Sequence, residues 1–86
     1  MTSFAYTIND PMGLHARPVG LMVKIINQKK DKVTVRFKDK EADGRRLYQV
    51  LSLGAKQGDK IELVIEGEEE ENTAKELQHM FQAENL

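Results

Sequence analysis

Four short segments of this 86-residue chain alternate apolar with polar residues, and this alternation limits the fold more than any other feature. Successive side chains of a strand point to opposite faces, so strict alternation predicts a strand with one buried face. The predicted strands cover residues 3–8, 33–38, 41–43 and about 59–66. All four are apolar on one face only. We therefore expect an antiparallel or mixed sheet with helices on one face and water on the other.

Three further stretches repeat their apolar residues at the spacing of a helix, namely residues 16–28, residues 47–53 and a last one that begins around 68–70. Pro18 suits a first helical turn, and Gly54 stands where the second helix should end. The expected order is β-α-β-β-α-β-α in one α+β domain that spans residues 1–86. The outer helices should bury Ala16, Val19, Met22 or Val23, Ile26, Ala74, Leu77 and Met80 or Phe81.

Composition excludes several classes of function. The chain has no cysteine, so it cannot form a disulfide or a zinc–thiolate site. A net charge of -1 argues against a nucleic-acid partner. The longest apolar runs fall far short of the roughly 20 residues needed to cross a bilayer, and the first residues do not resemble an export signal. We expect a cytoplasmic monomer with no cofactor, no metal and no direct membrane insertion.

The sequence Gly-Leu-His-Ala-Arg-Pro at residues 13–18 places a histidine at the start of the first predicted helix. The amides of Ala16 and Arg17 have no helical acceptor there, so they and the helix dipole favour an anion beside the imidazole. Arg17 adds a multidentate cation. Because both features disfavour an imidazolium, His15 is expected to be neutral with a free ring nitrogen. The arrangement fits a phosphoryl group attached to His15 and bound by Ala16 and Arg17.

The same motif lacks the other parts of an enzyme. No serine, aspartate or glutamate is predictably placed to orient His15, and no second general acid or base lies in the motif. No glycine-rich nucleotide loop is present, so the phosphoryl group cannot come from ATP bound by this chain. We therefore expect a carrier of phosphoryl groups and not an enzyme.

Residues 13–18 resemble the active-site signature of the HPr family, the histidine-containing phosphocarriers of the bacterial phosphoenolpyruvate:sugar phosphotransferase system. Residues 51–58, Leu-Ser-Leu-Gly-Ala-Lys-Gln-Gly, resemble the second signature of that family at the expected spacing. The resemblance implies an open-faced β-sandwich, with a four-stranded antiparallel sheet and three helices on one face. It also implies that Enzyme I phosphorylates His15 on Nδ1, that His15 passes the group to a IIA component, and that Arg17 neutralises the phosphoryl charge.

A second candidate feature is a surface where partners would dock. A helical turn would set Leu47 and Leu51 on one outward-leaning face, and the resemblance places this helix beside the first. Alternatively, Leu47 and Leu51 are ordinary core residues. The predicted docking residues are Gly20, Leu21, Lys24, Arg46, Leu47, Tyr48 and Leu51.

Two positions depart from the family pattern. Position 12 usually offers an amide or hydroxyl near the active histidine, and Met12 offers neither, which leaves the orientation of the imidazole open. Position 46 carries a kinase-modified serine in many Gram-positive members, and here it is Arg46. An alternative function is also kept open. It is an HPr-fold regulatory or binding module, or a carrier of a regulatory, non-sugar branch, that docks partners through the same surface.

Overall fold

The structure, a computed structural model, describes all 86 residues and contains the seven predicted elements in the predicted order. Each end lies within about two residues of the position that periodicity indicated. The strands are β1 (Thr2–Thr7), β2 (Lys32–Phe37), β3 (Lys40–Asp43) and β4 (Lys60–Glu66). The helices are α1 (Ala16–Asn27), α2 (Leu47–Leu51) and α3 (Glu70–Ala83).

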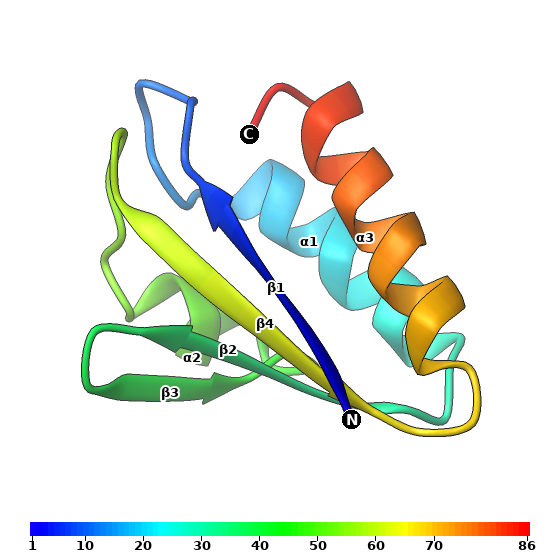
Figure 1. The fold of residues 1–86 in the computed structure, drawn as a ribbon. Helices are drawn as coiled ribbons and strands as arrows, with labels where there is room; N and C mark the ends of the chain where they lie inside the picture. The colour runs from blue at the N-terminus through cyan, green and yellow to red at the C-terminus, as the bar shows by residue number, and fades with distance from the viewer.

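The strands form one antiparallel sheet in the order β1-β4-β2-β3. Figure 1 shows α1 and α3 side by side on one face of the sheet, with α2 lying next to β3. The other face is open. This architecture confirms the expected α+β open-faced sandwich. None of the three helices has the length and apolar character needed to cross a membrane.

The hydrophobic core lies between the sheet and the helices. The central strands β2 and β4 bury their apolar side chains almost completely, because each has a neighbour on both sides and helices above. On the open face Arg36 instead forms ion pairs with Glu41 and Glu62. The core residues of the central strands and the outer helices are Val33, Val35, Ile61, Leu63, Ile65, Val19, Met22, Ile26, Leu77 and Phe81.

Two details of the predicted helix faces were wrong. Ala16 is exposed, because it lies about a quarter-turn beyond the stripe that Val19, Met22 and Ile26 form, and Pro18 is buried in its place. In α3 the buried set includes Thr73, which periodicity of apolar residues could not indicate. Its hydroxyl donates a 2.6 Å hydrogen bond to the buried carboxylate of Asp31, and this bond fixes the start of α3 against the loop after α1.

Candidate functional site

His15 occupies the N-cap position of α1, as predicted, with an extended backbone at φ -141° and ψ 171°. Its carbonyl accepts the Val19 amide at 3.2 Å and begins the helix. The chain reaches this position through Gly13, whose φ of +66° is the left-handed conformation that favours glycine. The imidazole itself makes no capping hydrogen bond, so its ring nitrogens are available for other partners.

The first turn of α1 leaves two amides unpaired. Neither the Ala16 nor the Arg17 amide donates a hydrogen bond within the chain, and Pro18 has no amide hydrogen. Two unpaired N–H groups at a helix start favour an anion in front of them. The structure therefore agrees with the predicted phosphate-binding role of both residues, although no bound group is present to test that role.

Asp10 orients the imidazole, contrary to our expectation that no carboxylate would do so. His15 Nε2 lies 2.8 Å from Asp10 Oδ2, and both side chains are largely buried, with 25% and 18% exposed. A tight turn explains the contact: the Met12 amide donates to Asp10 Oδ1 at 2.9 Å and the Gly13 amide donates to the Asp10 carbonyl at 2.8 Å. An aspartate that opens a cluster of proline and glycine is typical of such a turn, so the sequence did carry a signal for Asp10.

The charge on Asp10 assigns the ring nitrogens their roles. The hydrogen bond from the Met12 amide, followed by that from His15, lowers the pKa of the Asp10 carboxyl below its ordinary value of 3.8. An ionised carboxylate only accepts hydrogen bonds, so Nε2 carries the proton that faces it. Nδ1 makes no hydrogen bond within the chain. The ring is thus oriented through the backbone of Met12, although the Met12 side chain offers no polar group.

The two signature segments meet in space at this loop. The Leu14 amide donates to the Ala55 carbonyl at 3.0 Å, and the Gln57 side chain donates to the Asn9 carbonyl at 3.0 Å. A Cβ atom on Gly13 would lie 2.6 Å from the Ala55 oxygen, so only glycine allows this approach. The turn before β4 therefore supports the loop that positions His15.

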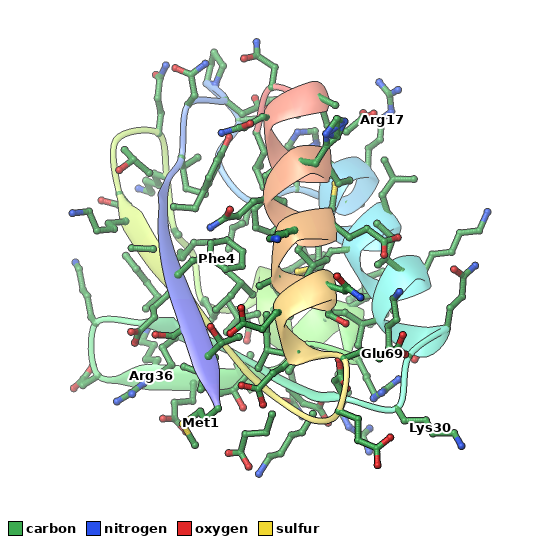
Figure 2. The ribbon with its side chains drawn as sticks, turned by 45° about the vertical axis from the view of Figure 1, so that its right-hand side comes forward. Met1, Phe4, Arg17, Lys30, Arg36 and Glu69 are labelled. Carbon is green, nitrogen blue, oxygen red and sulfur yellow. The ribbon has the colours of Figure 1, made fainter.

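Arg17 lies at the rim of the site and does not contact the imidazole. Its side chain is 79% exposed, and its nearest ionic partner is Glu84, at 3.5 Å and just beyond the end of α3. Figure 2 shows Arg17 at the end of the molecule where α3 finishes. The structure thus places a mobile cation next to His15 in sequence, and Glu84 is the anion that it would leave on meeting a phosphoryl group.

The predicted docking residues lie on neighbouring helices, because α1 packs against α2. Leu47 and Leu51 are half-buried and pack against the core, so both interpretations of these leucines hold in part. Tyr48 is 82% exposed, as is most of Met12, which sequence analysis did not assign to this surface. The remaining predicted docking residues are half-buried in the case of Gly20 and Leu21 and exposed in the case of Lys24 and Arg46.

Residues 2–83 match the family model described as the PTS HPr component phosphorylation site. The phosphocarrier protein HPr of Lysinibacillus sphaericus is 32% identical over 77 residues, which cover 90% of this chain and 88% of that protein. The multiphosphoryl transfer protein of Salmonella typhimurium is 35% identical over 78 residues, but these make up only 21% of its length. The chain therefore belongs to the HPr family of phosphocarriers of the phosphotransferase system.

Solved structures agree with this assignment. A histidine-containing phosphocarrier protein from Mycoplasma superposes with a TM-score of 0.95 over 99% of this chain and 97% of its own, and at 21% identity it supports the fold alone. An HPr from Thermoanaerobacter tengcongensis superposes with a TM-score of 0.89 at 29% identity, over 96% of this chain and 93% of that one. The expected family and fold are both confirmed.

Proposed function

We propose that His15 accepts a phosphoryl group from phospho-Enzyme I on Nδ1 and passes it to IIA components of the sugar phosphotransferase system. In this proposal the protein acts as a cytoplasmic monomer. The observation that carries the proposal is the state of the ring: Nε2 is held by Asp10 at 2.8 Å, whereas Nδ1 has no partner in the chain. The nitrogen left free is the one that can attack phosphorus.

The surroundings of His15 suit the storage of a phosphoryl group. The unpaired amides of Ala16 and Arg17 can donate to its oxygens, and the Arg17 guanidinium can add a fixed pattern of donors. Asp10 is the only carboxylate bonded to the ring, and it is engaged by Met12 and His15. It is therefore not available to activate a water molecule, which supports a carrier over a phosphatase.

Partner binding is assigned to the surface formed by Gly20, Leu21, Lys24, Arg46, Leu47, Tyr48 and Leu51, here called the docking surface. Its most exposed apolar member is Tyr48, at 82%. Aromatic side chains with this exposure are favoured anchors of protein interfaces. Enzyme I and the IIA components would bind this surface in turn, since both must reach the same nitrogen.

A second candidate function is a carrier of a regulatory or non-sugar branch. Two observations favour it. A phosphoryl donor subunit of a PEP-dependent dihydroxyacetone kinase from Providencia stuartii is 30% identical over 77 residues, and Arg46 removes the position at which many family members are regulated. In this case phosphoryl acceptance on His15 is unchanged, and only the acceptor protein differs.

The test is incubation with phosphoenolpyruvate and Enzyme I, followed by intact-mass measurement. We expect the wild-type protein to gain one acid-labile phosphate, His15→Ala to gain none, and His79→Ala to behave as wild type. His79 is the matched control because it is the only other histidine and is exposed on α3. Acid-labile phosphate on His15→Ala would refute the assignment. Transfer from the phosphorylated protein to sugar-branch IIA components separates the two candidate functions.

A further inference from the structure

Asp10 lies outside both signature segments, yet its side chain is hydrogen-bonded to the ring of His15. The carboxylate is held from two sides, because Oδ1 accepts the Met12 amide at 2.9 Å and Oδ2 faces Nε2 at 2.8 Å. The backbone of Asp10 is fixed as well, since its amide donates to the Leu86 oxygen at 2.7 Å and its carbonyl accepts the Gly13 amide. A carboxylate with so little freedom can impose both an orientation and a proton position on the imidazole.

We propose that Asp10 is a positioning residue for phosphoryl transfer: it keeps the proton of His15 on Nε2, so that Nδ1 both attacks the phosphoryl group and releases it. This inference rests on the proposed function. It extends that function to a residue that neither signature segment contains.

The proton position balances both transfer steps. In the accepting step, the lone pair of Nδ1 forms a bond to phosphorus while the bond from phosphorus to the donor nitrogen breaks, and the donor keeps that electron pair. Because Nε2 keeps its proton, the phosphorylated ring is positively charged, and the Asp10 carboxylate offsets that charge at 2.8 Å. In the donating step the bond between Nδ1 and phosphorus breaks, Nδ1 keeps the electron pair, and the ring is again neutral with its proton on Nε2.

The other charged groups around this loop do not compete for the ring. Arg17 on α1 pairs with Glu84 at 3.5 Å, and Lys56 is an exposed side chain in the turn beside Gly13. None of these three forms an ion pair or a hydrogen bond with the imidazole. Asp10 is thus the anion that faces the ring, as the aspartate of a catalytic triad faces its histidine.

A purely structural role for Asp10, as a tie between the loop and His15, would show the same contact. Asp10→Asn separates the two roles. The Asn oxygen would keep the Met12 amide, so its NH₂ group would face Nε2 and donate to it. The ring proton would then lie on Nδ1 and block the attacking nitrogen. In a catalytic triad the same change keeps the geometry and lowers the rate about 10⁴-fold, and for the more exposed His15 we expect a loss of at least about tenfold.

The experiment uses phosphoramidate, a small phosphoryl donor that needs no partner protein, in a His79→Ala background where only His15 can react. The matched control is Asp59→Asn, because Asp59 accepts the Lys56 amide at 2.8 Å in a similar turn without contacting His15. The ring ¹⁵N chemical shifts report the tautomer, and intact mass reports the rate of phosphate uptake. We expect the Nε2–H tautomer and wild-type uptake in Asp59→Asn, and the Nδ1–H tautomer with uptake at least about tenfold slower in Asp10→Asn.

The pH profile of dephosphorylation adds a readout that a structural tie would not move. Without the carboxylate, the phosphorylated ring loses its Nε2 proton more readily, so the profile of Asp10→Asn shifts to lower pH and that of Asp59→Asn does not. Equal tautomers and equal rates in the two variants would overturn the inference. If Asp10→Asn fails to fold, Asp10→Ser makes the same comparison, because its hydroxyl can accept the Met12 amide but is too short to reach Nε2. A wild-type protein that gains no phosphate from Enzyme I would instead refute the proposed function, while the tautomer would still report on Asp10.

Discussion

The Leu14 amide donates a 3.0 Å hydrogen bond to the Ala55 carbonyl, so the residue before His15 is tied to the turn that precedes β4. This bond requires the backbone of Gly13 to pass within van der Waals distance of Ala55 and Lys56. The two signature segments of the family therefore form one structural unit. The second segment supports the loop that carries Asp10 and His15, although it holds no group of its own on the ring.

A pair of glycine substitutions tests this support. Gly13→Ala would place a Cβ atom 2.6 Å from the Ala55 oxygen at a φ of +66°, so we expect a loss of more than about 2 kcal/mol in the free energy of unfolding. Gly20→Ala is the control, because its Cβ would meet nothing within 4 Å inside α1 and should stabilise the protein by about 0.5–1 kcal/mol. Urea unfolding measures both. Equal effects of the two substitutions would contradict the proposed packing.

Arg17 and Tyr48 should affect different steps of phosphoryl transfer. Arg17→Ala removes a cation from the developing charge, so we expect the rate within the saturated Enzyme I complex to fall by about 10²-fold. Tyr48→Asp should instead weaken partner binding with little loss of stability, because the Tyr48 side chain is 82% exposed. Steady-state kinetics at several Enzyme I concentrations separates the two effects. The assignment of Arg17 fails if its substitution changes only the apparent affinity.

Arg45 closes the C-terminal end of α1 and should be a major source of stability. Its guanidinium donates to the carbonyls of Ile26, Lys29 and Asp31 at 2.8–2.9 Å and to the Asn27 side chain at 3.2 Å. Removing these donors leaves partly buried acceptors unsatisfied, so Arg45→Met should cost about 2–4 kcal/mol.

Thermal unfolding measures this loss, at about 4–8 °C in Tm for each kcal/mol in a domain of this size. Arg36→Met is the control, because Arg36 forms only exposed ion pairs on the open face and should cost less than about 1 kcal/mol. A loss at Arg45 no greater than at Arg36 would show that the guanidinium contacts do not contribute to stability.

Sequence analysis predicted the regular elements well because each has a clear period of apolar residues. It also placed His15 at the N-cap of α1, because a proline three residues later marks the first turn of a helix. The contacts of Asp10 and Arg45 were not predicted. Both are charged residues in loops, and their partners are fixed by the path of the backbone and not by any periodicity. Recognising a turn that begins at Asp10 would have indicated the first contact but not the second.

Acid should weaken the loop that carries Asp10. The pKa of its carboxyl is lowered, chiefly by the hydrogen bond from the Met12 amide and then by His15. A group whose pKa is lower in the folded state contributes stability above its unfolded value of 3.8, and this contribution is lost as pH falls through the folded pKa. We therefore expect wild type to be more stable than Asp10→Asn at about pH 5, with the difference vanishing near about pH 2. Urea unfolding at both pH values checks this, and a constant difference would contradict it.

Arg46 should make the protein unresponsive to an ATP-dependent HPr kinase. Its side chain is 69% exposed, and Ser52, the nearest serine in sequence, uses its hydroxyl to donate to the Gln49 carbonyl at 2.6 Å. We expect no acid-stable phosphate on the wild-type protein after treatment with such a kinase, and a gain on Arg46→Ser, which serves as the positive control. Acid-stable phosphate on Ser52 would contradict this prediction.

The same residue should contribute to docking through its charge. Arg46 is the N-cap of α2, where a cation is unfavourable for the helix by about 0.3–1 kcal/mol, and its contact with Asp43 is long at 3.9 Å. Helix stability therefore does not account for Arg46, and an acidic partner surface would. Arg46→Glu should leave the free energy of unfolding unchanged or slightly raised while it weakens binding to Enzyme I, most strongly at low salt. Arg46→Gln should fall between the two, and equal affinity of all three proteins for Enzyme I would show that Arg46 takes no part in docking.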